Sequence, residues 1–287
     1  MASEALPSGG PPERVHGRRL FVIWAALTVV GVLLIVFVAG PHMPPGNFSQ
    51  EARDQRHINI LLAALAVPVL FGVWTCLAYI FTTFRQGEGE LQDGPPVRGH
   101  PRLQVVWVVA TAAIVLSLGA FGTEELLGSA KGAGGGQGPD PLAVPAGQKV
   151  QVQVIGQQWA WTFRYPAYGG VETSQLALPE GQTTELHVTS LDVSHSFWAI
   201  QLGVKADAIP GNDNVAFVTP RHTGSFEIRC AELCGLWHGH MHNTGVVMTQ
   251  AGFAAWIKQQ QAANAPATKT LPPYSTHYFP DPIRRAG

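Results

Sequence analysis

Residues 149–155 read KVQVQVI, in which polar and apolar side chains alternate. This period of two is typical of a β-strand with one buried face. Strand-like patterns recur at residues 183–189, 224–229 and 244–249, and proline and glycine residues typical of turns lie between them. Many short strands divided by turns favour a β-sandwich or β-barrel. The C-terminal half is therefore predicted to be all-β.

The segments that flank these strands differ from them in composition. Residues 252–263 place large apolar side chains on one face, which predicts an amphipathic helix. We predict that the β domain spans residues 141–264 and that the proline-rich residues 265–287 form an extended C-terminal tail. Upstream, residues 128–140 are rich in glycine and lack core-forming side chains, so they are predicted to be a flexible linker.

Three long apolar segments precede this linker, at residues 20–40, 57–84 and 103–127. Each reaches the roughly 20 residues that a membrane-spanning helix needs, so each is predicted to cross a membrane. The first follows a short basic segment, residues 1–19, and also resembles a signal peptide. Its apolar stretch is longer than the roughly 7–15 residues of a signal peptide, which favours a retained helix or signal anchor over cleavage.

The positions of the arginines predict how these helices cross the membrane. They lie before the first apolar segment and between the second and third, at Arg14, Arg18, Arg19, Arg85, Arg98 and Arg102. Because such residues favour the cytoplasmic side, residues 1–19 should be cytoplasmic and the β domain should lie outside. We expect a multi-pass protein of the prokaryotic plasma membrane. The net charge of −1 gives no basic field that would attract nucleic acid.

Residues 230–241 read CAELCGLWHGHM and combine three kinds of metal-binding side chain. Cys230, Cys234, His238 and Met241 follow one another at intervals of four, four and three, and His195 lies upstream in the segment DVSHSFW. Thiolate, imidazole and thioether ligands together favour copper. Zinc would accept two cysteines and two histidines, but not the methionine, and a disulfide is the other alternative. Two cysteines would allow two thiolates to bridge two copper ions.

At these residues the sequence resembles subunit II of the haem–copper cytochrome c oxidases, whose dinuclear copper centre is called CuA. The resemblance extends from the third apolar segment through the amphipathic helix. It includes the segments QQWAWTF at 157–163, DVSHSFW at 192–198 and GVKADAIPG at 203–211. It implies a cupredoxin-like, Greek-key β domain that follows two transmembrane helices of the family, so the first apolar segment would be an additional span.

The resemblance also implies roles for individual residues. The copper ligands would be His195 and His238 through nitrogen, Cys230 and Cys234 as bridges, Met241 through sulfur, and Glu232 through its backbone carbonyl. The Glu232 side chain would help to bind Mg²⁺ or Mn²⁺ at the contact with subunit I. Trp159 would be the residue at which electrons arrive from cytochrome c, and Asp207 would lie near subunit I. His240 and His242 flank the motif but have no counterpart in this ligand set.

By this resemblance the chain is the electron-accepting subunit of a cytochrome c oxidase, and it is not catalytic alone. It would take electrons from cytochrome c and pass them to the haem of subunit I, where O₂ reduction is coupled to proton pumping. The expected partners are subunit I, subunit III, the cytochrome donor and membrane lipid.

Two departures from the family pattern modify these expectations. Many relatives carry a glutamate, linked to proton uptake, where this chain has Gln104, and an amide cannot release a proton. Many relatives also carry several acidic residues after the aromatic segment, whereas residues 163–173 contain one arginine and a single glutamate. Steering of a basic cytochrome c should then be weak, which favours a membrane-tethered or complex-bound cytochrome donor.

Three other functions fit the sequence less well. A thioredoxin-like copper-delivery protein would carry its cysteines early, before a helix, whereas here they lie late, between strands. A quinol oxidase subunit of the same fold would lack the copper ligands. Nitrous oxide reductase carries a CuA domain too, but it is soluble and lacks the membrane spans.

Overall fold

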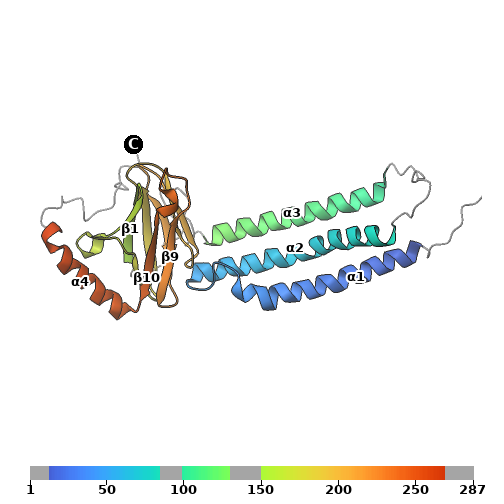
Figure 1. Cartoon of the computed structure of the whole chain (residues 1–287), viewed down its shortest axis with the longest axis horizontal. Helices are drawn as coiled ribbons and strands as arrows, with labels where there is room; N and C mark the ends of the chain where they lie inside the picture. Colours follow the sequence, from blue (N-terminus) through green and yellow to red (C-terminus); the bar gives the residue numbers. More distant parts are fainter. Residues whose placement is uncertain (1–12, 85–98, 130–149, 269–287) are drawn as a thin grey trace, which may run out of the picture. The chain divides into compact units, whose positions relative to one another are not determined.

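The computed structural model describes residues 13–84, 99–129 and 150–268 (Figure 1). The predicted linker, apart from its first residues, and most of the predicted tail lie outside the described residues. The chain forms two compact units. One comprises Met1–Met43 and His57–Gly99, and the other comprises Pro44–Arg56 and His100–Gly287.

Three helices are long and apolar enough to cross a membrane: α1 (Glu13–Leu34), α2 (Gln50–Thr83) and α3 (Pro101–Ser129). α1 is continued by a π-helical turn, η1 (Ile35–Ala39), and a 3₁₀ turn, η2 (Gly40–His42). Large apolar side chains on these helices are exposed, as lipid-facing surfaces require; Phe81 is 73% and Leu116 72% exposed. The chain is therefore a membrane protein, and the predicted order of three apolar helices before an all-β domain is confirmed.

α1 and α2 pack against each other within the first unit. The Trp24 indole N–H donates a hydrogen bond to the Pro68 carbonyl oxygen at 2.8 Å. Gly31 leaves room for the Phe71 ring, because a Cβ atom at Gly31 would lie 2.3 Å from a carbon of that ring. Small residues that admit a bulky neighbour are typical of helix packing in membranes. The surfaces of α1 and α2 therefore fit each other where Gly31 faces Phe71.

α2 begins at Gln50, seven residues before the predicted start of this span. The early start follows from a cap and from contacts with the β domain. The Ser49 hydroxyl accepts a hydrogen bond from the Ala52 N–H at 2.9 Å and donates one to the Leu202 carbonyl at 2.6 Å. Gly203, at φ +65°, lies so close that a Cβ atom there would be 2.8 Å from the Ala52 Cα. The Glu51 carboxylate accepts the Thr219 N–H at 3.0 Å.

In residues 150–268, ten strands form two five-stranded sheets. The first sheet has the order β3-β2-β1-β5-β8, and the second has the order β4-β10-β9-β6-β7. The strands are β1 (Val150–Gln157), β2 (Ala160–Tyr165), β3 (Val171–Thr173), β4 (Ala177–Pro179), β5 (Thr184–Ser190), β6 (His195–Ala199), β7 (Val204–Ala208), β8 (Asn214–Val218), β9 (Gly224–Cys230) and β10 (His242–Met248). The four strands expected from sequence correspond to β1, β5, β9 and β10, within two residues at each end.

The pairing of the strands is mostly antiparallel, with two parallel exceptions. β1 pairs with β5 and β4 pairs with β10 in parallel, and both pairings join strands distant in sequence. Alternate side chains of β1 and β5, such as Val152, Val154, Leu186 and Val188, are fully buried in the core between the sheets. The intervening side chains of Gln153 and Thr189 are fully buried too, so the strands are found where the alternation predicted them, but the prediction of only one buried face is wrong for most of β1 and β5.

Tyr165 and helix α4 (Gln250–Thr268) close one side of the core. The fully buried Tyr165 hydroxyl donates a hydrogen bond to the Ala177 carbonyl at 3.0 Å and accepts one from the Ala177 N–H at 2.8 Å. Burial raises the pKa of Tyr165, so it stays neutral. α4 packs Phe253 and Ile257 into the core and continues to Thr268, beyond the predicted helix end. The first residues predicted as tail are therefore helical.

Candidate metal centre

Strand pairing places the predicted metal ligands at one end of the second sheet. His195 is the first residue of β6, and Cys230 is the last residue of β9. β6 and β9 are antiparallel neighbours, with Phe197 opposite Cys230, so His195 lies close to Cys230. The loop from β9 to β10 supplies the other candidates and contains a 3₁₀ turn, η4 (His238–His240).

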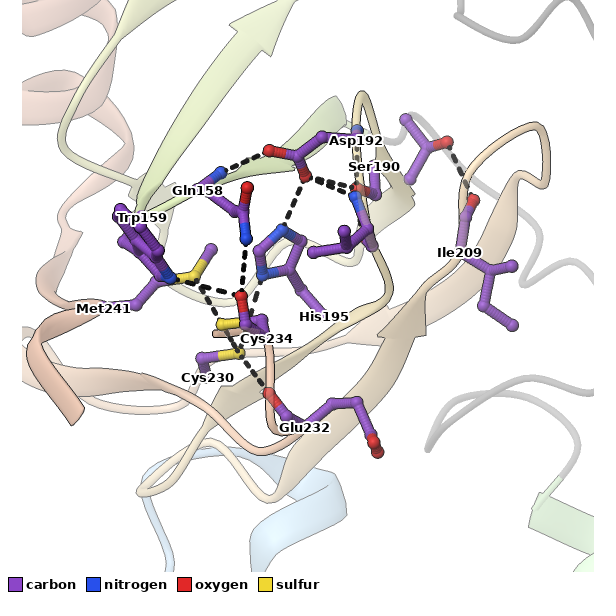
Figure 2. A network of polar contacts seen from close by, with 12 residues as sticks. Gln158, Trp159, Ser190, Asp192, His195, Ile209, Cys230, Glu232, Cys234 and Met241 are labelled. Carbon is purple, nitrogen blue, oxygen red and sulfur yellow. Dashed lines mark hydrogen bonds and ion pairs between the residues drawn. The ribbon is translucent and has the colours of Figure 1, made fainter. Parts of the chain in front are cut away.

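The candidate side chains converge on the sulfur atoms of Cys230 and Cys234, and Figure 2 shows His195 and Met241 beside them. The Sγ atoms of Cys230 and Cys234 are 3.7 Å apart. The Nδ1 atom of His195 lies 3.9 Å from the Cys230 sulfur, and that of His238 lies 3.6 Å from the Cys234 sulfur. The Met241 Sδ atom is 3.8 Å from the Cys234 sulfur. Each cysteine therefore faces one imidazole.

Glu232 presents its backbone and its side chain in different directions. Its carbonyl oxygen lies 3.2 Å from the Cys230 sulfur, whereas its side chain is exposed and points away from the cluster (Figure 2). The cluster itself is mostly buried, because His195, Cys230, Cys234 and Met241 are each at most 8% exposed. The carbonyl is thus available to the cluster while the carboxylate remains available outside it.

The sulfur geometry fits a metal better than a disulfide. A disulfide joins its sulfurs at about 2.05 Å, and both cysteines are free here. With metal–sulfur bonds of about 2.3 Å, one ion can reach both sulfurs across 3.7 Å. Burial and the neighbouring Cys230 raise the pKa of Cys234 to about 12, so this thiol keeps its proton unless a cation displaces it. His195, Cys230 and Cys234 form a group that can hold a metal ion.

Asp192 orients the His195 ring by binding Nε2, the ring nitrogen that does not face the sulfur atoms. Its Oδ1 atom accepts hydrogen bonds from the His195 Nε2–H at 2.9 Å and the Val193 N–H at 2.6 Å, and its Oδ2 accepts the Gln158 N–H at 2.6 Å (Figure 2). Partial burial acts to raise the pKa of Asp192, but the hydrogen bonds from Gln158, His195 and Val193 outweigh it and lower that pKa. The carboxylate thereby leaves Nδ1 of His195 free to face the sulfurs. Sequence reasoning missed this residue, although a carboxylate three residues before a candidate histidine ligand is a usable signal.

Trp161 and Gly156 fix the other side of the His195 ring. The Trp161 ring lies edge-on to it, with the centroids 6.0 Å apart. A Cβ atom at Gly156 would lie 3.1 Å from both rings, so the glycine allows this close packing. The imidazole is therefore held by a hydrogen bond at one edge and by packing on its sides.

Trp159 contacts the loop from β9 to β10 directly. Its indole N–H donates a hydrogen bond to the Cys234 carbonyl at 3.2 Å, and the Gln158 side chain donates to the same oxygen at 2.9 Å. Gly235 turns the loop at φ +115°, where a Cβ atom would lie 2.9 Å from the Gln158 amide nitrogen. Only glycine suits both this backbone conformation and this close approach. Trp159 is half-buried and packs against the core of the β domain.

The remaining candidates lie outside the sulfur cluster. Asp207, on β7, is exposed and accepts a hydrogen bond from the Ser196 hydroxyl at 2.7 Å. The His240 ring lies against Trp237, with centroids 5.3 Å apart, and His242 is exposed at the start of β10. Gln104 is exposed in the first turn of α3.

A pocket of about 380 Å³ opens beside the cluster. It is lined by Cys230, His238 and Met241, and by Glu227, Arg229, Gly239 and His242. The candidate ligands are therefore accessible from this side, and the lining is polar around them.

The sequence has relatives over most of its length. The family described as "Cytochrome C oxidase subunit II, periplasmic domain" matches residues 171–248. Cytochrome c oxidase subunit 2 of Thermostichus vulcanus is 28% identical, over 87% of this chain and 89% of the relative. The chain belongs to the cytochrome c oxidase subunit II family. Subunit 2 of Synechocystis sp. is 27% identical, over 88% of this chain and 86% of that protein.

A solved structure of a subunit II domain is also similar. The crystal structure of the periplasmic domain of subunit II of cytochrome oxidase from Bradyrhizobium japonicum is 29% identical, covers 42% of this chain and 99% of that chain, and has a TM-score of 0.40. As a subunit II, the chain is part of an oxidase complex and has partner subunits. The predicted family and the predicted cupredoxin-like fold are confirmed.

Proposed function

We propose that this subunit II accepts electrons from a c-type cytochrome at a dinuclear copper centre and passes them to the haem of subunit I, where O₂ is reduced and protons are pumped. The observation that carries the proposal is the pair of buried sulfurs 3.7 Å apart, each facing an imidazole nitrogen. A zinc site needs only four such donors, whereas here a thioether and a carbonyl oxygen converge as well.

The proposed ligands are the residues that surround the two sulfurs. They are Cys230 and Cys234 as bridges, His195 and His238 through Nδ1, Met241 through sulfur, and Glu232 through its carbonyl oxygen. A thiolate-bridged copper pair, when bound, shares the charge of one electron between two ions, so that bond lengths change little on reduction. The exposed carboxylate of Glu232 suits the proposed Mg²⁺ or Mn²⁺ site shared with subunit I.

The protein's own contribution is to hold these donors in place. Asp192 and Trp161 fix the ring of His195, and the hydrogen bonds from Gln158 and Trp159 fix the Cys234 carbonyl. A rigid donor set limits movement when the charge changes, and outer hydrogen bonds tune the site. Trp159 joins the surface to a cysteine through a single hydrogen bond, which supports its proposed role as the residue where electrons arrive.

The wider assembly follows from the same proposal. The chain would lie in the prokaryotic plasma membrane with the β domain on the extracytoplasmic side, in contact with subunit I, subunit III and lipid. Asp207 would lie near subunit I. Since Gln104 cannot carry a proton, another subunit would supply the group for proton uptake. The cytochrome donor would be membrane-tethered or complex-bound.

Copper analysis and electron paramagnetic resonance on the purified oxidase test the proposal. We expect the hyperfine pattern of one electron shared by two copper nuclei, which differs from the pattern of a single copper. The C230S variant should lose this signal because a bridge is missing, and M241L should keep copper with a changed potential. Zinc in place of copper, or an unchanged signal in C230S, would overturn the assignment.

A further inference from the structure

The pocket of about 380 Å³ beside the metal centre gives access to it from the solvent. Three of the proposed copper ligands line this pocket: Cys230, His238 and Met241. His195, in contrast, is fully buried, and Asp192 and Trp161 lie against its ring. A metal ion that arrives from the solvent can therefore reach the proposed ligands through the pocket.

His242 lines the same pocket but is not one of the proposed ligands. It is exposed, it directly follows Met241, and it is the first residue of β10. In the antiparallel pairing of β9 with β10 it lies opposite Arg229, so the two side chains leave the same face of the sheet. The His242 imidazole is thus both open to the solvent and part of the pocket wall.

His240 is exposed as well but has a different position. Its ring lies against Trp237, with centroids 5.3 Å apart, and it is not among the residues that line the pocket. The two histidines that flank Met241 therefore differ in their access to the metal centre, which makes one a matched control for the other.

The charges beside His242 are balanced. Arg229 also lines the pocket, and an unpaired guanidinium would repel a cation there. Its Nε–H and a terminal N–H both point to Oε1 of Glu227, at 2.7 and 2.6 Å. This ion pair offsets the positive charge, so the pocket can admit a metal cation.

We propose that His242 is an entry ligand for copper, which binds a Cu⁺ ion first and passes it to the neighbouring Met241 and to His238. The proposal rests on the proposed copper centre and adds how the ions enter it. Imidazole and thioether both suit Cu⁺, so each transfer exchanges one suitable ligand for another. When the ion moves on to a cysteine it displaces the thiol proton, which is released to the solvent, and no electron is transferred.

Cu⁺ uptake by the full-length chain, purified without copper and kept reduced under anaerobic conditions, tests the proposal. The probe is Cu⁺ bound to a coloured chelator, and the loss of colour measures uptake with time. H242Q removes the entry ligand, H242M replaces it by a thioether that also binds Cu⁺, and H240Q is the control. Every chain compared, the reference chain included, carries C76S, because Cys76 is a third, exposed thiol that would compete for Cu⁺.

We expect H242Q to take up Cu⁺ about tenfold more slowly than the reference chain, because transfer from His242 to the next residue is intramolecular. H242M and H240Q should load at the reference rate. After loading, one-electron oxidation by ferricyanide should give the same paramagnetic resonance signal of a copper pair in all four chains. Equal rates in H242Q and the reference chain, or an equal slowing in H240Q, would overturn the proposal.

Two further outcomes decide the role of His242. Loss of the pair signal in H242Q, with the β domain still folded by denaturant unfolding, would make His242 a permanent ligand and contradict an entry role. Slow loading of H242M would contradict it too, whether or not H242Q folds, because a Cu⁺ ligand is then present and does not help. If the reference chain itself gives no pair signal, the proposed copper centre fails; if it does and H242Q loads equally fast, only the entry ligand is wrong.

Discussion

Replacing Asp192 by asparagine should weaken copper binding without touching a ligand. The carboxylate accepts three strong hydrogen bonds, from the His195 ring at 2.9 Å and from the N–H groups of Val193 and Gln158 at 2.6 Å each. Asparagine keeps only one acceptor oxygen, and its NH₂ group must face one set of these donors. At least one hydrogen bond is lost, and the acceptor of the remaining hydrogen bonds is no longer charged.

The size of the effect follows from these contacts. A hydrogen bond to a charged group contributes about 1.5–3 kcal/mol. The side chain of Asp192 is 32% exposed, so water recovers part of the loss. Outer partners of metal-binding histidines typically account for a 10–100-fold change in affinity, which is about 1.4–2.8 kcal/mol. The two estimates agree, and we expect copper affinity to fall by about tenfold or more.

A competition titration against a chelator of known copper affinity measures this change. E172Q serves as the control, because Glu172 is a carboxylate of the same domain that pairs with Arg164, on the first sheet. D192N should release copper at lower chelator concentrations than the wild type, and E172Q should behave as the wild type does. If D192N holds copper as tightly as the wild type, the His195 ring is fixed by packing alone, and the reasoning from the hydrogen bonds is wrong.

Three further changes have defined outcomes. Y165F removes a buried hydroxyl that pairs with both backbone groups of Ala177, so denaturant unfolding of the β domain should show a loss of about 1–3 kcal/mol. Burial acts to lower the pKa of His187, but hydrogen bonds to two carboxylates raise it overall. Its stabilising effect should therefore be complete below the ordinary value of 6.5 and be lost as pH rises through the raised pKa, and H187Q should remove this dependence from unfolding curves measured across pH. The intact mass of the purified subunit should include α1, and G31L should lower the yield of assembled oxidase because the leucine collides with Phe71.

Each of these outcomes has a clear opposite. Unchanged stability in Y165F would mean that water satisfies the freed backbone groups. A pH dependence that persists in H187Q would assign the titration to another group. A mature chain that starts after residue 40 would show that α1 is removed, and G31L would then leave the mature protein unchanged.

Much of the fold could be predicted from local sequence patterns. The alternation of polar and apolar residues identified β1 and β5, although polar side chains on the other face, such as Gln153 and Thr189, are buried as well. Local patterns could not reveal the first turn of α2, since residues 51–56 are mostly polar. That turn is set by the Ser49 cap and by its contact with Gly203, which lies far away in the sequence.

The candidate metal centre, like the fold, could be predicted only in part from local sequence patterns. The spacing of Cys230, Cys234, His238 and Met241 predicted the residues that come together, because a single loop carries them. The role of Asp192 depends on the direction of the His195 ring, which only the fold decides. The exposure of Leu236 was also not predicted, since a leucine is expected to be buried, yet Leu236 is 85% exposed.

The strand order has a consequence for how the site matures. β9 and β10 form a local antiparallel hairpin, so we expect four of the candidate ligands to come together early in folding. His195 joins them only when β6 pairs with β9, and the parallel pairings of β1 with β5 and of β4 with β10 close longer loops, which is slow. Until then the hairpin carries two thiols, one imidazole and one thioether, and it lacks the second imidazole. We therefore expect the partly folded chain to hold a metal less tightly than the finished domain, because one of the two imidazoles is not yet in place.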